Sequence, residues 1–175
     1  MKIRIISVLA CIAASISFAS VFGADDFALH GIFTDNMVLQ RDIPVPVWGK
    51  ARAGDKVKVS FSGQTKEAVA DKDGKWIVKL DPLKASSEAQ ALTVSSSIGN
   101  RQSKIENILV GDVWICSGQS NMAAKVGETT DANYPNIRLF MVRGKASEKP
   151  STSVFGEWKV CSSETVSKFS AVGYY

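Results

Sequence analysis

Apolar and polar side chains alternate along much of the stretch from residue 27 to residue 110, as they do in β-strands that bury one face. In Lys56-Val57-Lys58-Val59 the valines share one face of the expected strand and the lysines share the other. Seven short strands are expected on this pattern, at Met37–Gln40, Val45–Gly49, Lys56–Ser62, Lys66–Ala70, Trp76–Leu80, Leu92–Ser97 and Lys104–Val110.

Turn-forming residues separate these strands at regular intervals. Gly54-Asp55 and Ser62-Gly63 are typical turn pairs. Pro44 and Pro46 indicate an edge strand or the entry to one, because proline cannot donate a hydrogen bond to a neighbouring strand. This succession of strands and turns predicts an all-β sandwich over residues 25–110.

The pattern changes at Gly111. Val113–Cys116 is a short, nearly continuous apolar run, which predicts a strand buried on both faces of a parallel sheet. Ser117–Met122 then forms a sharp turn, and Met122–Lys125 resembles the first turn of a helix. The join contains neither proline nor a Gly/Ser-rich spacer, so residues 111–175 are expected to pack directly on the sandwich.

Ser120 stands at this expected junction of strand and helix. Its hydroxyl would project from the carboxyl edge of the sheet, where clefts form, and its backbone N–H would lie near the positive end of the helix. That N–H could stabilise an oxyanion, and Gly118 would allow a close approach that a side chain would block. On this pattern alone, an ordinary helix-capping serine is the more common explanation.

Several blocks of sequence together resemble the bacterial sialate O-acetylesterase family. They span the chain downstream of its first 34 residues, in order: Asp35–Arg41, Pro46–Gly49, Asp73–Trp76, Gly111–Met122, Asn136–Phe140, Trp158–Ser162 and Phe169–Tyr175. The resemblance implies an amino-terminal β-domain followed by the start of an SGNH-type hydrolase domain, a three-layer α/β/α sandwich. It also implies removal of O-acetyl groups from sialic acid or related sugars.

The same resemblance assigns roles to the loop. Ser120 matches the nucleophile of the family, and Gly118, Gln119 and Asn121 match the loop that supports it and the oxyanion. The general base of the family belongs to a carboxyl-terminal Asp-x-x-His pair, which this chain does not contain. Its single histidine, His30, has Phe27 three positions earlier and is expected to be structural.

The end of the sequence also indicates an incomplete hydrolase domain. Phe169, Val172 and Tyr175 recur at helical spacing, and no glycine or basic cap closes that segment. We therefore expect an amino-terminal piece of a longer serine esterase, inactive on its own.

Composition and the first 24 residues bear on location. The chain has 175 residues, of which 45% are hydrophobic and 22% charged, as in a soluble globular protein. Residues 1–24 combine a positive start, an apolar run and small residues, which predicts a signal peptide and a periplasmic or extracellular protein; lipidation at Cys11 is a minor alternative. The remaining cations are scattered, so neither a nucleic-acid partner nor a stable membrane partner is expected.

No cofactor or metal is expected. A single histidine and two cysteines in the mature chain, Cys116 and Cys161, cannot supply a tetrahedral zinc site. The two thiols could form a disulfide in an exported protein, although each is more simply a small buried residue. Asp71-Lys72-Asp73-Gly74 lacks the spacing of a calcium loop and predicts a tight hairpin between Val69 and Trp76.

Two alternative functions stay open. The β-sandwich could be a carbohydrate-binding module that stacks a sugar on Trp48 or Trp76, although both lie in apolar strands and are more simply core residues. Alternatively, the esterase could act on acetylated plant or microbial polysaccharide instead of acetylated sialic acid. The sequence does not rank these sugars.

Overall fold

The structure, a computed structural model, describes residues 27–128, 131–143 and 153–175. The signal peptide predicted for residues 1–24 lies outside them. The strands are β1 (Ala28–Leu29), β2 (Val38–Gln40), β3 (Val45–Lys50), β4 (Lys56–Phe61), β5 (Gln64–Val69), β6 (Lys75–Leu80), β7 (Ser86–Ser96), β8 (Gln102–Gly111), β9 (Tyr134–Phe140) and β10 (Trp158–Cys161). The helical segments are the 3₁₀ turn η1 (Ser120–Ala123) and the helices α1 (Ser163–Val166) and α2 (Ala171–Tyr174).

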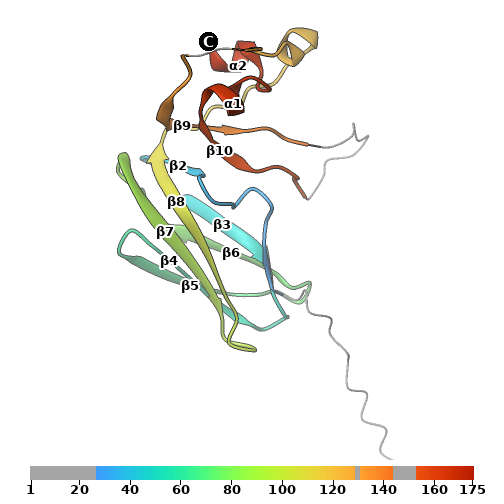
Figure 1. The fold of residues 1–175 in the computed structure, drawn as a ribbon. Helices are drawn as coiled ribbons and strands as arrows, with labels where there is room; N and C mark the ends of the chain where they lie inside the picture. Colours follow the sequence, from blue (N-terminus) through green and yellow to red (C-terminus); the bar gives the residue numbers. More distant parts are fainter. Residues whose placement is uncertain (1–26, 129–130, 144–152) are drawn as a thin grey trace, which may run out of the picture.

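The first eight strands form two sheets that share one hydrophobic core (Figure 1). The larger sheet has the order β2-β8-β7-β4-β5 and the smaller has the order β1-β3-β6. Alternate residues of both sheets point into the core, including Val45, Val47, Val57, Val59, Val78, Leu80, Leu92 and Val94. The prediction that this part is all-β is confirmed for its described residues, and all seven expected strands are present with shifted ends.

Strand pairing is antiparallel except between β2 and β8. These two strands run parallel, with Val38 opposite Leu109 and Gln40 opposite Gly111. A parallel pair needs a long connection, and here the connection is the rest of the sandwich. The pairing places the end of β2 beside the point where the chain leaves the sandwich.

The predicted turn pair Ser62-Gly63 and the prolines near β3 can be compared directly with the structure. Ser62 and Gly63 both have positive φ, 48° and 75°, which fits the tight turn of the β4–β5 hairpin. Pro46 pairs with Lys79 of β6, while its other side has no strand in the described chain. Strand β3 is the middle strand of its sheet, so the expected edge is found only locally at Pro46, and Pro44 stands directly before the strand, at its entry.

The turn at residues 71–74 differs from its prediction. The Asp71 carboxylate accepts hydrogen bonds from the backbone N–H groups of Asp73 at 2.9 Å and Lys75 at 2.8 Å, so the turn is tight. However, β5 belongs to the larger sheet and β6 to the smaller. The turn crosses from one sheet to the other and does not close a hairpin.

The remaining described residues form a smaller unit at one end of the sandwich (Figure 1). Strands β9 and β10 pair in an antiparallel hairpin, and a small core of Ala132, Leu139, Cys161 and Val166 lies beneath α1. Within the described ranges this unit has no parallel sheet, and each helix has four residues. The three-layer α/β/α arrangement expected for residues 111–175 is therefore not visible in these segments.

The strand predicted at Val113–Cys116 is wrong for this structure. These residues form no strand, and Trp114 and Ile115 are 83% and 93% exposed. A parallel strand becomes buried only between neighbouring strands, and no described strand pairs with this segment.

The smaller unit nevertheless packs firmly on the sandwich. Trp158 of β10 lies against the sandwich core, and its indole N–H donates to the backbone oxygen of Ile32 at 2.9 Å. Asn107 of β8 donates to the side chain of Asn36 at 2.7 Å and accepts from Arg138 of β9 at 3.3 Å. These contacts agree with the expectation that the two parts join without a flexible linker.

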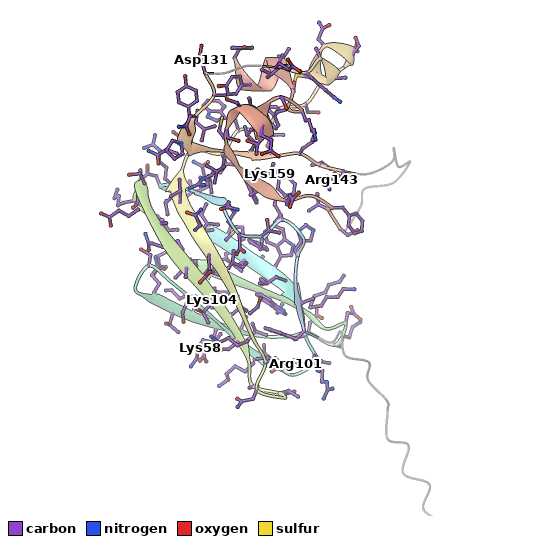
Figure 2. All side chains as sticks on the ribbon, in the orientation of Figure 1. Lys58, Arg101, Lys104, Asp131, Arg143 and Lys159 are labelled. Atoms are coloured by element: carbon purple, nitrogen blue, oxygen red, sulfur yellow. The ribbon has the colours of Figure 1, made fainter. Side chains whose placement is uncertain are left out.

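Charged side chains are spread over the molecule. Figure 2 shows Lys58, Arg101 and Lys104 on the sandwich, and Arg143 and Lys159 on the β9–β10 hairpin. Lys58 lies 3.4 Å from Glu67, and Arg143 and Lys159 each lie 3.1 Å from Glu157. These three cations therefore pair with nearby carboxylates. Among the described residues, no helix has the length and apolar character needed to cross a bilayer.

Candidate active site

Ser120 lies on an exposed loop and begins the 3₁₀ turn η1. No hydrogen bond reaches its hydroxyl from the part of the chain that the structure describes. The helix expected at Met122–Lys125 is absent, because the backbone turns extended at Ala124, with φ −63° and ψ 130°. A single turn has little dipole, so Ser120 does not receive the oxyanion support of a long helix here.

The three neighbours assigned to the loop take defined positions. Gln119 precedes η1 and its backbone oxygen accepts from the N–H of Met122 at 2.9 Å, while the oxygen of Asn121 accepts from Ala124 at 3.2 Å. A Cβ atom added at Gly118 would lie 2.8 Å from Cγ of Met122. Gly118 therefore leaves room for the side chain of Met122, and its role in the loop stays a prediction. The side chains of Gln119 and Asn121 point to no described partner.

The histidine of the chain does not serve Ser120. His30 stacks on Trp48 with a centroid separation of 5.0 Å, and its Nδ1 accepts from the backbone N–H of Ile32 at 3.4 Å. It is thus a packed residue of the sandwich, as expected. The chain has no other histidine that could take the Ser120 proton.

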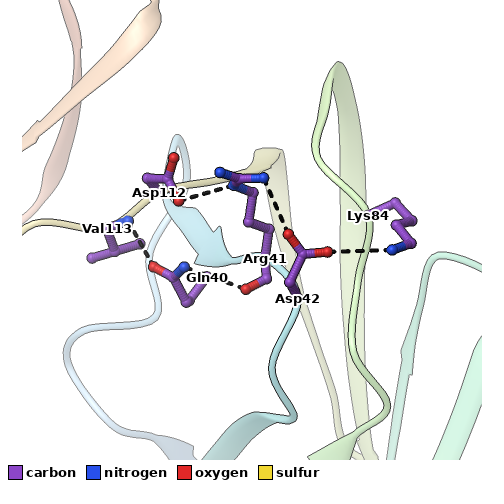
Figure 3. Close-up of polar contacts among 6 residues, drawn as sticks. All are labelled: Gln40, Arg41, Asp42, Lys84, Asp112 and Val113. Atoms are coloured by element: carbon purple, nitrogen blue, oxygen red, sulfur yellow. Dashed lines mark hydrogen bonds and ion pairs between the residues drawn. The ribbon is translucent and has the colours of Figure 1, made fainter.

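The segment that carries Ser120 is anchored to the sandwich where it leaves β8 (Figure 3). Oε1 of Gln40 accepts a hydrogen bond from the backbone N–H of Val113 at 2.8 Å. Nε of Arg41 donates to Oδ1 of Asp112 at 2.9 Å, and the backbone N–H of Arg41 donates to the oxygen of Gly111 at 2.9 Å. We call Gln40, Arg41, Asp112 and Val113 the exit clamp.

The exit clamp continues into a row of charges. Arg41 Nη1 lies 3.1 Å from Asp42, and Asp42 lies 3.4 Å from Lys84 (Figure 3). The hydrogen bond from Arg41 lowers the pKa of Asp112 below its ordinary value, with the positive charge of Arg41 adding to this. The hydrogen bond and charge of Asp112 likewise raise the pKa of Arg41. Asp112 is therefore an anion at neutral pH.

A second anchor holds the far side of the loop. The backbone N–H of Ala171 donates to the oxygen of Ala124 at 2.8 Å, and the N–H of Val126 donates to the oxygen of Phe169 at 3.1 Å. Residues 114–123 therefore form a loop whose two ends are fixed to different parts of the molecule.

A broad depression of about 870 Å³ lies beneath this loop. Its lining includes Val113, Trp114, Met122, Ile137 and Tyr174, and it does not include Ser120. Arg138 also lines it, and burial lowers the pKa of that guanidinium. Its Nε and Nη1 have no hydrogen-bond partner among the described residues. The depression is mainly apolar, and Ser120 lies outside its lining.

The two cysteines of the described chain are both free. Cys161 is buried, as expected, whereas Cys116 is exposed because the predicted strand around it does not form. Burial, followed by the nearby Cys161, raises the pKa of the Tyr174 hydroxyl. No cluster of three metal-ligating side chains occurs in the described ranges.

Comparison with known proteins identifies relatives of the chain. The sialate O-acetylesterase of Rattus norvegicus is 30% identical over 142 residues, which cover 71% of this chain and 26% of that protein. The Mus musculus enzyme is 31% identical over 135 residues, covering 67% and 25%. The chain is homologous to sialate O-acetylesterases. The resemblance seen in the sequence is thereby confirmed at the level of this esterase family.

A solved structure extends the homology to the fold. A carbohydrate acetylesterase from Xanthomonas citri matches with a TM-score of 0.77 and 34% identity, covering 84% of this chain and 35% of that one. No protein-family model matches the chain. The chain spans about a quarter of the length of the curated relatives that it matches. The SGNH type and a bacterial origin stay predictions.

Sequence reasoning assigned no role to the exit clamp. Gln40, Arg41 and Asp112 lie inside blocks that carried the resemblance, but nothing in the sequence showed that the blocks meet. The one signal in the sequence was that polar residues stand at the ends of two apolar strands. The parallel pairing of β2 with β8 brings these two strand ends together.

Proposed function

We propose that this chain is part of a carbohydrate esterase that removes O-acetyl groups, with Ser120 as its nucleophile. The match to the Xanthomonas citri carbohydrate acetylesterase is the main support. It covers 84% of this chain, whereas residues 27–111 make up only about half. The match therefore extends beyond the sandwich into the segment that carries Ser120.

The proposed reaction is acyl transfer. A general base takes the Ser120 proton as the oxygen attacks the acetyl carbonyl, and backbone donors of the loop hold the oxyanion. The bond to the sugar oxygen breaks, that oxygen takes the proton from the base, and water then releases acetate from the acetyl-enzyme. Gly118, Gln119 and Asn121 support the loop. No cofactor or metal is needed for an ester substrate.

The base lies outside residues 1–175 in this proposal. His30 is engaged with Trp48 and Ile32, so it is not available to Ser120. The relatives are also about four times as long as the part that matches. We therefore expect activity only from a protein in which the reading frame continues past Tyr175.

A substitution at Ser120 tests the assignment. In the protein extended past Tyr175, Ser120→Ala should lower acetate release from an acetyl ester by at least about a thousandfold, since in this proposal the acetyl-enzyme forms on the Ser120 oxygen. Ser117→Ala is the matched control, because Ser117 is an exposed serine of the same loop. Full activity of the Ser120→Ala protein would overturn the proposal.

The substrate is an O-acetylated sugar, and two classes are in competition. Acetylated sialic acid is favoured by the names of the mammalian relatives, and a neutral acetylated polysaccharide is compatible with the name of the Xanthomonas citri enzyme. Acetate release from acetylated sialic acid should exceed release from acetylated xylan if the first holds. The reverse order would establish the polysaccharide.

A sugar-binding role for the sandwich has less support. Trp76 is buried, so it offers no stacking face. Trp48 is half-buried between His30 and Phe33, whose ring packs edge-on with a centroid separation of 4.7 Å. Both tryptophans therefore act in packing.

Export completes the proposal. The pattern of residues 1–24 supports secretion to the periplasm or the medium, with a mature start between residues 20 and 25. Amino-terminal sequencing of the secreted protein tests this. Intact Met1 on cytosolic protein would contradict it.

A further inference from the structure

We propose that the β-sandwich positions the catalytic loop, and that Gln40 and Arg41 are the positioning residues that do so through Val113 and Asp112. This inference rests on the proposed esterase function. It gives the sandwich a role in the reaction of the same chain, in place of a separate sugar-binding role.

The first step of the argument is where support for the loop ends. Beyond Gly111 the chain leaves β8, and residues 112–121 are exposed and belong to no strand. The last backbone N–H before the loop that bonds to the sandwich is that of Val113, which donates to Gln40 at 2.8 Å. The direction in which the chain enters the loop is therefore set at Gln40.

The second step concerns the charges. Arg41 bonds to Asp112 at 2.9 Å and lies 3.1 Å from Asp42, which in turn lies 3.4 Å from Lys84 (Figure 3). Exposed ion pairs of this kind contribute little to the free energy of unfolding. A guanidinium shared between two carboxylates nevertheless fixes how those carboxylates are oriented, because its N–H donors have a rigid planar geometry. Arg41 therefore orients Asp112 and the chain that follows it.

The third step is that the loop is held at both ends. Ala124 and Val126 bond to the backbone of Ala171 and Phe169, so the carboxyl end of the loop is also fixed. A loop with both ends fixed has few ways to place the side chain at its centre. A displacement of about 1 Å can cost about a hundredfold in rate, so a shift in the exit clamp should affect catalysis.

Kinetics of the extended protein test the proposal. Gln40→Met removes the acceptor of the Val113 N–H and a hydrogen bond to the backbone oxygen of Arg41, and Arg41→Met removes the contacts with Asp112 and Asp42. Both substitutions keep side-chain length, and each should lower kcat by about tenfold or more while KM changes less than about twofold. Arg41→Lys keeps the charge and should recover part of kcat. The melting temperature should stay within a few degrees of the original.

The matched control is Lys104→Gln. Lys104 forms an exposed ion pair with Glu106 on the same strand, β8, away from the exit clamp. The Lys104→Gln variant should leave kcat and KM unchanged. If the Met variants keep full kcat, or lose it only in proportion to unfolded protein, the positioning role is wrong.

A gentler variant keeps the test decisive if the Met variants do not fold. Asp112→Ala removes the acceptor of the Arg41 hydrogen bond at an exposed position, so it should fold and lower kcat. Unchanged kcat in folded Asp112→Ala would also overturn the proposal. Ser120→Ala separates the two hypotheses, because full activity there removes the proposed function itself, whereas normal kcat in the clamp variants removes only the positioning role.

Discussion

Asp55 shows how one buried charge can be accommodated in a small sandwich. Its carboxylate is 1% exposed and accepts hydrogen bonds from Oγ of Ser97 at 2.8 Å and from the backbone N–H of Ile98 at 3.0 Å, together with the hydroxyl of Ser96. Burial alone would raise its pKa. The hydrogen bonds outweigh burial, so the pKa lies below its ordinary value of 3.8.

The sign of this shift gives a prediction. Because the pKa of Asp55 is lower in the folded state than in the unfolded state, its contribution is complete above about pH 4 and is lost as the pH falls through the folded pKa. Asp55→Asn should lower the free energy of unfolding by about 1–3 kcal/mol at neutral pH, since an amide cannot accept all these bonds. Urea unfolding between pH 7 and pH 2 measures both proteins. The variant should lose less stability with acid than the original, and equal acid sensitivity would contradict the assignment.

Gly49 is a position where the structure leaves no room for a side chain. An added Cβ would lie 2.1 Å from the backbone oxygen of Ala28 and 2.8 Å from the ring of Trp76. Gly49→Ala should therefore lower the free energy of unfolding by about 2 kcal/mol or more, because strand β1 must move away. Gly111→Ala is the control, since its Cβ would meet only Val38 at 3.6 Å. Equal melting temperatures for the two variants would contradict this packing.

At the scale of elements, the sequence was most informative where one face of a strand is buried. Strands β3, β4 and β6 were predicted nearly to their ends, because their side chains alternate in burial. Strand β7 begins at Ser86, six residues before the predicted Leu92, because residues 86–91 carry few apolar side chains and pair irregularly with β8. Strands β1, β9 and β10 were missed, since they are short or lack alternation.

The loop that carries Ser120 is where the sequence pattern was least informative about conformation. Ser120 and its neighbours were found through a sequence resemblance, whereas their conformation depends on partners that the sequence pattern does not reveal. The apolar run at Val113–Cys116 predicted a buried strand, yet a run of side chains cannot supply the neighbouring strands that bury it. The exit clamp depends on a contact between residues 71 positions apart, as for Arg41 and Asp112.

Proteolysis measures how the elements are joined. Strand β8 runs unbroken from Gln102 to Gly111, so the join between the two parts should resist cleavage. Chymotrypsin should cut the 175-residue chain after Trp114, which is exposed, well before it cuts after Trp76, which is buried. Mass spectrometry of early fragments checks the order. First cleavage between Asn107 and Gly111, by any protease, would indicate a loose linker instead.

At the scale of the whole molecule, one end of the structure carries much exposed apolar surface. Large exposed side chains include Trp114, Ile115, Val142, Phe155 and Tyr175. Extended apolar surface of this kind indicates an interaction partner or a tendency to aggregate. The sandwich end carries paired charges on its strands, and its large exposed apolar side chains are Ile43, Val69 and Ile77.

This asymmetry predicts the behaviour of the 175-residue chain made alone. It should bind a hydrophobic dye such as ANS more strongly than the protein extended past Tyr175, and it should release essentially no acetate, because Ser120 has no base. Dye fluorescence and acetate release, compared at equal concentration, measure both properties. Turnover by the short chain at a rate comparable to the long one would refute the assignment of Ser120.

The parallel pair of β2 and β8 also has a consequence for the order of folding. In the described sheet β2 has β8 as its one strand neighbour, and the segment between them forms most of the sandwich. Closing such a long loop costs chain entropy that only contacts between distant residues can recover, so pairings of this kind form slowly. The hairpins around β4 and β5 are local and can form first. We therefore expect the pairing of β2 with β8 to form after the local hairpins, so that Leu39 of β2 is among the last side chains to enter the shared core.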